Sequence, residues 1–272
     1  LFSNIEMPLV PVLAQMQFNG MMVDESELKD FGDTLKAQVE TLSHEICDLA
    51  GEEFNVNSHQ QLGKILFEKL QLPVYKKTKN GYTTDVEVLE KLKGQHPIIE
   101  KILEYRTLAK LNSTYVEGLI PYINPKTKRI HSSFHQIITA TGRISSTEPN
   151  LQNIPTRAEL GKQIRKAFKP AEGNIYIDAD YSQVELRVLA HMSQDETMID
   201  AFKHNEDIHT KTASQVFNVS MDEVTSKQRS DAKAVNFGIV YGKSDFGLSE
   251  DLNIPVKQAK EYIENYFNKY NK

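Results

Sequence analysis

The chain contains very little cysteine: Cys47 is the only one among 272 residues. A single cysteine cannot form a disulfide within the chain, and one isolated thiol does not indicate a zinc site. Its neighbours Ile46, Leu49 and Ala50 are apolar, so we expect a buried, inert thiol. Disulfide-stabilised and zinc-stabilised classes of small protein are therefore excluded.

Long apolar segments are also absent. No run approaches the roughly 20 apolar residues that a membrane-spanning helix needs, and the first residues lack both parts of a secretory signal. We therefore expect a soluble, cytoplasmic protein with no membrane partner. The chain starts with Leu1 rather than methionine, and its last helical pattern breaks off at Lys272, so we expect an excerpt from a longer protein.

Positive charge is not in excess, because 32 Lys and Arg stand against 37 Asp and Glu, a net charge of -5. This average gives no support to nucleic-acid binding. The charge is unevenly distributed, however. Residues 1–54 contain 2 basic and 11 acidic residues, whereas residues 55–111 contain 10 basic and 6 acidic residues. The second segment is therefore expected to carry a local basic surface.

Apolar residues at helical spacing dominate the chain and predict a mostly helical α+β protein. In the first half, the predicted helices cover residues 24–49, 60–70, 85–93 and 97–122, with an exposed basic loop at 76–82. The second half is predicted to contain strands within 129–139, a turn-rich loop at 141–155, an apolar strand at 174–179, and helices at 182–192, 196–203, 208–216, 221–241 and 255–270. There are no internal repeats or low-complexity tracts.

Two carboxylates stand at the end of the apolar strand predicted at 174–179. Alternation along a strand would place Asp178 and Asp180 on one face, where a rigid sheet end can hold a divalent metal ion. The alternative is that the strand end is solvated and Asp180 caps the following helix. The residues alone leave both interpretations open.

A second pattern lies in the helix predicted at 221–241, where Arg229, Lys233, Phe237 and Tyr241 recur every four residues. This spacing places two cations and two aromatic rings along one helix face. Such a face can bind a polyphosphate at one end and stack a base at the other. An ordinary amphipathic helix is the alternative. Gly238 and Gly242 favour close approach of a partner, or a hinge.

A third pattern is the loop framed by glycine and proline at residues 141–155. Arg143 and the amides of Gln152 and Asn153 can donate hydrogen bonds to acceptors in a DNA minor groove or to phosphate. The alternative is a structural loop, since Asn, Gln, Ser and Pro are common turn residues.

These patterns occur within longer motifs. Residues 180–187 (DYSQVELR) resemble the first conserved palm motif of family A DNA polymerases, the bacterial DNA polymerase I type. Residues 229–242 are similar to the fingers-helix motif of that family, and residues 141–143 with 150–155 to its template- and primer-gripping segment. Residues 207–210 and the thumb-like run 104–115 match as well. The motifs appear in the family order across nearly the whole chain.

The resemblance implies a right-hand polymerase architecture. It assigns residues 1–19 to a connector, 20–125 to the thumb, 126–195 to the first part of the palm, and 196–272 to incomplete fingers. It also implies template-directed DNA synthesis in replication and repair, in which dNTPs are added to a primer 3'-hydroxyl with release of pyrophosphate. The implied cofactors are two Mg²⁺ ions, and the implied partners are primer-template DNA and dNTPs. A monomer associated with the bacterial nucleoid is expected.

The resemblance also implies residue roles. Asp180 would be the catalytic ligand of both Mg²⁺ ions, and the carbonyl of Tyr181 would help to hold one of them. The implied dNTP-binding residues are Arg229, Lys233, Phe237, His209, Gln183, Glu185 and Tyr241. Glu185 would exclude ribonucleotides, and phenylalanine at position 237 implies rejection of dideoxynucleotides by the intact enzyme. The implied DNA-binding residues are Arg143, Asn150, Gln152, Asn153, Lys110, Asn112, Thr114, Lys76, Lys77 and Lys79.

The chain departs from the family pattern in two respects. The second carboxylate motif of the family, His-Asp-Glu, does not occur among the 272 residues, so we expect this chain to be inactive alone. A non-catalytic DNA-binding remnant is the alternative. Gln228 stands where many relatives carry a second arginine. The role of Asp178, either next to the metal ligands or simply exposed, stays open.

Overall fold

The computed structural model describes residues 1–78, 81–155 and 159–270. The chain divides into two compact units, Leu1–Tyr176 (unit 1) and Ile177–Lys272 (unit 2). The predicted first part of the palm, residues 126–195, therefore has residues in both units. Within the described ranges, no helix has the length and apolar character needed to cross a membrane.

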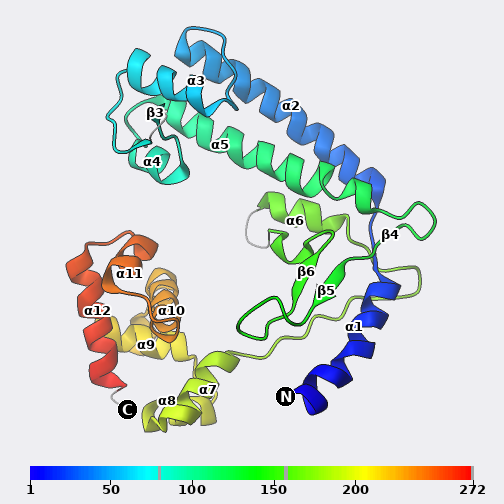
Figure 1. Ribbon diagram of the computed structural model, residues 1–272. Helices are drawn as coiled ribbons and strands as arrows, with labels where there is room; N and C mark the ends of the chain where they lie inside the picture. The colour runs from blue at the N-terminus through cyan, green and yellow to red at the C-terminus, as the bar shows by residue number, and fades with distance from the viewer. Residues whose placement is uncertain (79–80, 156–158, 271–272) are drawn as a thin grey trace. The chain divides into compact units, whose positions relative to one another are not determined.

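Unit 1 consists of helices with three short antiparallel strand pairs (Figure 1). Its α-helices are α1 (Met7–Asn19), α2 (Glu25–Ala50), α3 (His59–Lys64), α4 (Val86–Lys91), α5 (Pro97–Leu111) and α6 (Glu159–Lys166). Its strands are β1 (Met21–Met22), β2 (Lys77–Thr78), β3 (Gly81–Tyr82), β4 (Arg129–Ile130), β5 (Ser133–His135) and β6 (Ser145–Thr147). Short π-helical turns precede α1, follow α3 and extend α5.

The core of unit 1 lies between α2 and α5, which run side by side in opposite directions (Figure 1). Leu28, Leu35 and Ile46 of α2 and Ile98 and Ile102 of α5 are completely buried. These residues recur at the helical spacing from which α2 was predicted, and the prediction of a helix at 24–49 is confirmed. The interface buries the apolar stripe of α2 and leaves the acidic face in water.

Both ends of α2 are fixed by local chemistry. The Asp24 carboxylate accepts hydrogen bonds from the backbone N–H groups of Ser26 and Glu27, which satisfies donors that have no partner within the helix. Gly51 ends the helix with a positive φ of 69°, a conformation that glycine adopts without steric cost. Asp24 also accepts from Lys169 at 2.8 Å, so residue 169 is tied to the start of α2.

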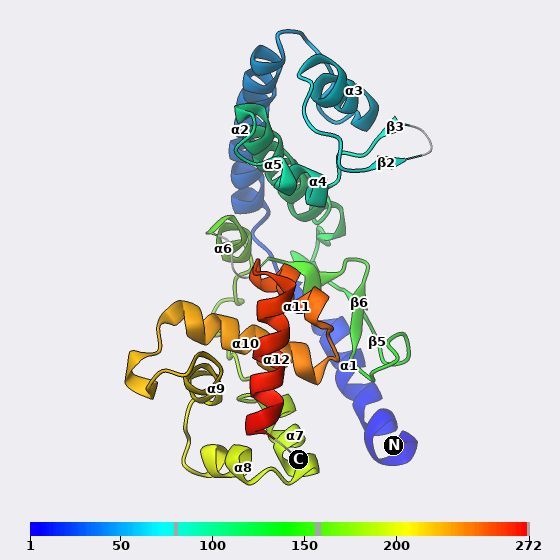
Figure 2. The ribbon, with the colours of Figure 1, turned by 90° about the vertical axis from the view of Figure 1, so that its left-hand side faces the viewer.

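The strands pair as β1 with β4, β2 with β3, and β5 with β6. The predicted strands within 129–139 are confirmed as β4 and β5, although residues 136–139 are not in a strand. The β2–β3 pair is a hairpin that projects from the helices (Figure 2) and aligns Lys77 with Tyr82. Ser132, just before β5, links the β5–β6 pair to the following loop. Its hydroxyl lies 2.7 Å from Ser146 Oγ of β6 and donates to the carbonyl of Pro149.

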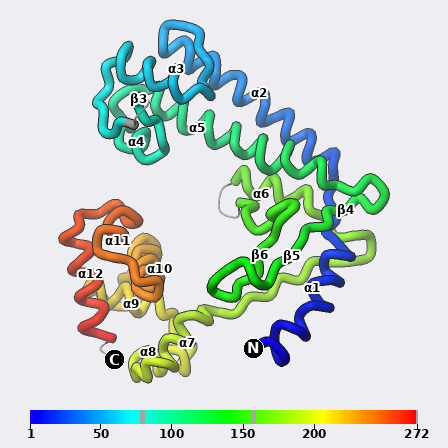
Figure 3. Tube along the Cα trace, viewed as in Figure 1, coloured from blue at the N-terminus to red at the C-terminus, as the bar shows by residue number. Residues whose placement is uncertain are grey.

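Unit 2 is helical throughout its described elements (Figure 3). Its α-helices are α7 (Val184–Ser193), α8 (Glu196–Lys203), α9 (Ile208–Phe217), α10 (Ser226–Val240), α11 (Asp245–Leu252) and α12 (Val256–Lys269). Leu186, Met198, Ile208, Val235 and Tyr266 form its buried core. The helices predicted at 196–203, 208–216 and 255–270 are confirmed within one or two residues, whereas α11 was not predicted.

The predicted apolar strand at 174–179 is wrong. These residues have no regular secondary structure, and Ile175 and Ile177 are 80% and 84% exposed. A strand needs a neighbour to pair its backbone N–H and C=O groups, and no strand in the described ranges pairs with this segment. Asp178 and Asp180 consequently do not share the face of a strand.

Three helices predicted as continuous are divided. The region predicted as 60–70 consists of α3 and a π-helical turn at Ile65–Lys69. The region predicted as 221–241 consists of a 3₁₀ turn, Met221–Glu223, and of α10, because the Thr225 side chain accepts from Gln228 N and so starts a new helix. The region predicted as 97–122 consists of α5, a π-helical turn at Asn112–Glu117 and a 3₁₀ turn at Ile120–Tyr122.

Gly32 on α2 lies against Val116 of the π-helical turn at Asn112–Glu117. A Cβ at this position would lie 2.7 Å from Val116 Cγ1. Replacing glycine by alanine would stabilise the helix by about 1 kcal/mol through helix propensity. Overpacking, however, costs about 1 to 3 kcal/mol, and the β-branched side chain of Val116 cannot easily change rotamer to relieve the clash. We expect Gly32→Ala to lower the free energy of unfolding measured in urea.

The neighbouring exposed position supplies the control, since Asp33→Ala changes propensity without a clash and should not destabilise the chain. In a Val116→Ala background, Gly32→Ala should cost less. An equal cost in both backgrounds would contradict the packing argument.

Candidate functional site

Helix α10 presents the predicted row of two cations and two aromatic rings. Arg229 and Lys233 are exposed, Phe237 is half-buried, and Tyr241, at the end of the helix, is 57% exposed. Lys233 Nζ lies 5.9 Å from the centroid of the Phe237 ring. The rings of Phe237 and Tyr241 are stacked, with centroids 6.2 Å apart and an interplanar angle of 16°. The four-residue spacing thus produces one continuous face.

Arg229 is joined to the start of α9 by Asp207. Arg229 Nε donates to Asp207 Oδ2 at 2.6 Å, and Asp207 Oδ1 accepts from the backbone N–H groups of His209 and Thr210. Partial burial acts to raise the pKa of Asp207, but the hydrogen bonds from Arg229 and from these backbone groups outweigh it and hold the pKa below its usual value. One carboxylate therefore caps α9 and fixes the cation of α10.

His209 lies directly behind this ion pair. It is 3% exposed, its ring centroid is 5.9 Å from that of Phe237, and its Nδ1 lies 3.0 Å from Asn236 Nδ2. Burial lowers the pKa of His209; the negative charge of Asp207 opposes this shift, and the positive charges of Arg229 and Lys233 add to it. The ring is therefore neutral at neutral pH.

Helix α7 brings Glu185 to the other end of α10. The Tyr241 hydroxyl donates to Glu185 Oε1 at 2.9 Å. Gln183 precedes α7 in a left-handed conformation with φ of 53°. The structure thus brings together six of the predicted residues from three helices of unit 2: Arg229, Lys233, Phe237, Tyr241, His209 and Glu185. Gln183 lies two residues before Glu185 in sequence. We call this set the α10 face.

The predicted metal ligands lie ahead of α7. Asp178, Asp180 and Tyr181 are exposed and belong to no regular element. No group of three or more His, Cys, Asp or Glu side chains suited to a metal ion occurs among the described residues. One carboxylate and one backbone carbonyl are hard oxygen ligands suited to Mg²⁺, but they form an incomplete set. The described residues can therefore supply some, but not all, of the ligands of a metal site.

The predicted DNA-binding residues of α5 and its extension differ in exposure. Lys110 and Thr114 are exposed, whereas Asn112 is 9% exposed and close to Gly32 of α2. The structure therefore does not place Asn112 on the same surface as the other two. Tyr115 connects this segment to the predicted loop, because its hydroxyl donates to the carbonyl of Asn153.

The loop residues predicted to contact DNA lie close together in sequence and are exposed: Arg143, Asn150, Gln152 and Asn153. The Asn150 side chain accepts from Gln152 N, and the Gln152 amide donates to the carbonyl of Ile144 at 2.9 Å. These two amides therefore hold the loop in shape, as the structural interpretation expects. Their contact with DNA stays a prediction.

The predicted basic loop forms the hairpin β2–β3. Lys76 is 3.5 Å from Asp85 Oδ2, and Lys77 Nζ lies 5.7 Å from the centroid of the Tyr82 ring. The predicted contact Lys79 lies outside the described residues. Behind the hairpin, Arg106 donates to the Thr84 carbonyl and to Thr84 Oγ1, and burial lowers the pKa of this arginine. Arg106 thereby attaches the base of the hairpin to α5.

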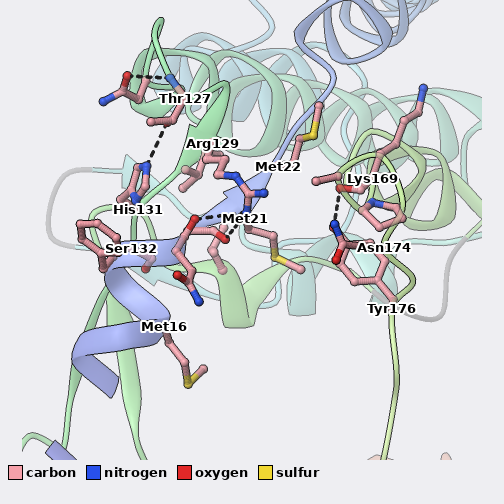
Figure 4. Close-up of a pocket in the computed structure, with 18 of the residues that line it drawn as sticks. Met16, Met21, Met22, Thr127, Arg129, His131, Ser132, Lys169, Asn174 and Tyr176 are labelled. Atoms are coloured by element: carbon pink, nitrogen blue, oxygen red, sulfur yellow. Dashed lines mark hydrogen bonds between the residues drawn. The ribbon is translucent and has the colours of Figure 1, made fainter. Parts of the chain in front are cut away.

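A cavity of about 1030 Å³ lies elsewhere in unit 1, and its lining includes none of the predicted site residues (Figure 4). Arg129 donates to the carbonyls of Asn19 and Gly20, and His131 lies within hydrogen-bond distance of Thr127 Oγ1 and of the Gln17 carbonyl. These polar groups already bind their neighbours, so the cavity does not present the convergent polar groups of a small-molecule site.

Three residues behind His209 were not predicted from the sequence: Asn236, Thr212 and Tyr270. Thr212 and Asn236 are completely buried and Tyr270 is 4% exposed. One signal was available: on α10, Asn236 occupies a core position beside Ala232 and Val235, and a polar residue at such a position must find a buried partner. The identity of the partners depends on contacts between distant parts of the chain.

The sequence matches a family model and is similar to curated relatives of the same kind. The family model described as DNA polymerase family A matches residues 25–272. DNA polymerase I of Bacillus caldotenax is 55% identical over 272 residues, and that of Lactococcus lactis subsp. cremoris is 56% identical over 271; each alignment covers 99% of this chain and 31% of the relative. The chain thus spans about a third of the length of these relatives.

A solved structure is also similar. The POL domain of Pol1 from M. smegmatis, in complex with DNA primer-template and dNTP, superposes with a TM-score of 0.89 and is 41% identical. The match covers 99% of this chain and 48% of that one.

The double role of Asp207 leads to a prediction. In Asp207→Asn, the side-chain oxygen still caps α9, but the negative charge is lost. Since that charge raises the pKa of His209, we expect the pKa of His209, measured by NMR titration, to fall further. The free energy of unfolding should fall by less than about 1 kcal/mol, because the ion pair is partly exposed, whereas Asp207→Ala should lose about 0.5 to 2 kcal/mol of capping as well.

Glu206→Gln is the matched control, since it removes the neighbouring ion pair with Lys211 and should leave the pKa of His209 unchanged. A rise in that pKa in Asp207→Asn would contradict the arrangement.

Proposed function

Because the chain belongs to DNA polymerase family A, we propose that it forms the thumb (20–125), the first part of the palm (126–195) and part of the fingers (196–272) of a DNA polymerase, behind a connector (1–19). The proposed reaction is template-directed addition of dNTPs to a primer 3'-hydroxyl, with release of pyrophosphate, in replication and repair. We further propose that the protein acts as a monomer in the cytoplasm, at the nucleoid.

The α10 face is the observation that carries this proposal. Arg229 and Lys233 present two cations one helical turn apart, and His209 lies beside them. Phosphate oxygens are bound well by guanidinium and ammonium groups. Beyond the cations, Phe237 offers a flat apolar surface to the sugar or base of the same nucleotide. The order of charges and rings along the helix follows the order of groups in a dNTP.

Glu185 suits the sugar of the bound nucleotide, and Tyr241 lies beside it at the base end. Their hydrogen bond at 2.9 Å holds the Glu185 carboxylate in place. A fixed side chain excludes a 2'-hydroxyl by occupying the volume that this group needs. We propose that Glu185 selects deoxyribonucleotides, that Gln183 lines the path of the triphosphate, and that Phe237 rejects dideoxynucleotides.

We propose that Asp180 and the carbonyl of Tyr181 would supply some of the ligands of two Mg²⁺ ions. Divalent ions bound there would neutralise charge on the transferring phosphate. The fit of this chain to such a site is partial, since the described residues hold no group of three ligands. A complete ligand set needs further carboxylates, and we therefore propose that the 272 residues alone do not catalyse DNA synthesis.

Unit 1 suits the DNA partner. Lys110 and Thr114 are exposed on one segment, and the Tyr115–Asn153 hydrogen bond joins that segment to the loop that carries Arg143 and Gln152. We propose that the exposed lysines hold duplex phosphates and that the loop donates to minor-groove acceptors, which are nearly the same for every base pair. Electrostatic binding of this kind weakens steeply with salt.

A second candidate function is DNA binding without catalysis. The absence of a three-ligand metal cluster among the described residues favours it for the isolated chain. The two candidates differ in whether a nucleotide binds at the α10 face.

The first test is nucleotide affinity. A hydrogen bond to a charged group contributes about 1.5 to 3 kcal/mol, so we expect Arg229→Ala and Lys233→Ala each to weaken dATP binding about 10- to 100-fold in a titration with Mg²⁺ and primer-template DNA. Lys227→Ala is the control, because Lys227 lies on the same helix, pairs with Asp231 and is 76% exposed. Equal affinities for all four proteins would refute a triphosphate site on α10.

The second test is primer extension on a recessed 3'-end with four dNTPs and Mg²⁺. We expect no extension from the 272-residue chain or from its Asp180→Asn variant, and loss of extension on Asp180→Asn in a complete family A polymerase that carries these residues. Asp222→Asn, an exposed position in a 3₁₀ turn, should leave that activity intact. Extension by the chain alone that disappears in Asp180→Asn would contradict the incomplete ligand set.

A further inference from the structure

A chain of buried polar side chains runs behind the α10 face, from α12 to α9. The Tyr270 hydroxyl lies 3.2 Å from Thr212 Oγ1, Thr212 Oγ1 lies 3.2 Å from Asn236 Oδ1, and Asn236 Nδ2 lies 3.0 Å from His209 Nδ1. All four residues are 4% exposed or less. Buried polar groups of this kind are retained when each finds a hydrogen-bond partner.

The direction of these hydrogen bonds follows from the donors available. Tyr270 is a neutral phenol at neutral pH, since burial raises its pKa to about 12, and its proton needs an acceptor. If Tyr270 donates to Thr212, Thr212 donates to Asn236 Oδ1, and the Asn236 amide donates to His209 Nδ1. The hydroxyl protons of Tyr270 and Thr212 and one proton of the Asn236 amide then each have an acceptor.

The reverse direction leaves groups unsatisfied. If His209 Nδ1–H donated to Asn236, the amide would donate to Thr212 and Thr212 to Tyr270. The Tyr270 proton would then have no acceptor among the described residues, in a site that is 4% exposed. In the first direction the proton without an acceptor is the one on His209 Nε2, an atom that is not fully buried and can therefore be hydrated or bind a ligand. The first direction is favoured, because an unsatisfied buried donor is costly.

The direction decides which nitrogen of His209 carries the proton. When Nδ1 accepts from Asn236, the neutral ring holds its proton on Nε2. No group among the described residues lies within hydrogen-bond distance of Nε2. A donor at this position, beside Arg229 and Lys233, can bind an anionic oxygen, whereas an unprotonated Nε2 would present a lone pair and repel it.

We propose that Asn236 is a positioning residue that fixes His209 as its Nε2–H tautomer, so that His209 donates a neutral hydrogen bond to the triphosphate at the α10 face. Thr212 and Tyr270 fix Asn236 in turn. This inference rests on the proposed function, since it assigns the triphosphate as the partner of Nε2–H. It adds a specificity element, because two cations attract any anion, whereas a fixed neutral donor also requires an acceptor at one place.

Asn236→Asp is the most direct variant. Its shape is nearly unchanged and its oxygen can still accept from Thr212, but a carboxylate cannot donate to His209 Nδ1. The carboxylate instead favours a proton on Nδ1, either in the other tautomer or in the charged ring. Asn265→Asp is the matched control: it makes the same chemical change on α12, where the Asn265 amide donates to the Val216 carbonyl at 3.4 Å outside this network.

The tautomer is read by long-range ¹H–¹⁵N NMR on the histidine-labelled chain, with His209 assigned by its loss in His209→Gln. We expect Nε2–H in the wild type and in Asn265→Asp, and a protonated Nδ1 in Asn236→Asp. A wild-type ring protonated on Nδ1, or a tautomer unaffected by Asn236→Asp, would overturn the proposal. Thr212→Val gives an independent variant, and it should shift the ring toward a mixture of tautomers.

The ligand part is tested with inorganic tripolyphosphate, added to the same samples. It should shift the His209 Nε2 signal in the wild type, and binding should be about tenfold weaker or more in Asn236→Asp, by the loss of one hydrogen bond to a charged acceptor. Unchanged affinity in Asn236→Asp, with affinity still lost in Arg229→Ala, would overturn the positioning role while the proposed function stands. No response in any protein would refute the triphosphate site itself, and the tautomer measurement would then decide the role of Asn236 alone.

Discussion

Asp207 binds two groups at once: the backbone N–H groups that open α9 and the guanidinium of Arg229 on α10. Because the cap fixes the carboxylate, the carboxylate in turn fixes the cation, and a long arginine side chain is held in one geometry before any ligand arrives. Preorganisation of this kind reduces the conformational entropy that binding must otherwise overcome. His209 and Lys233 lie next to this pair, so the character of the whole α10 face depends on the junction of α9 and α10.

The interior behind that junction contains four buried side chains that carry polar groups. Leu186, Val235 and Ile208 supply the apolar packing, while His209, Thr212, Asn236 and Tyr270 form hydrogen bonds within it. Burying these polar groups costs desolvation free energy, but their hydrogen bonds fix where each group donates and accepts. Under the proposed function, the α10 face would gain from this directionality, because exposed charges alone attract counter-ions without selecting among them. In unit 1, α2 and α5 pack mainly through leucine and isoleucine, although Asn112 beside Gly32 is also buried.

The sequence predicted those features that depend on local periodicity or on a family motif. Helix α2 was predicted within one residue because its apolar stripe and its two caps are both local. The row from Arg229 to Tyr241 was predicted from spacing, and the structure places it on one face. The strand at 174–179 was not formed, because a strand is defined by its neighbours and none of the described segments pairs with it. Asn236 was overlooked because its importance comes from Thr212, Tyr270 and His209, which lie on other helices.

The central claim is that a nucleoside triphosphate binds along α10 with its phosphates at Arg229 and its base near Tyr241. It is tested most directly by cross-linking a photoreactive dATP analogue to the chain and locating the modified peptide by mass spectrometry. The account predicts labelling within residues 226–241, lost when excess inorganic tripolyphosphate is present. Labelling that falls in unit 1, or that persists with tripolyphosphate, would contradict it.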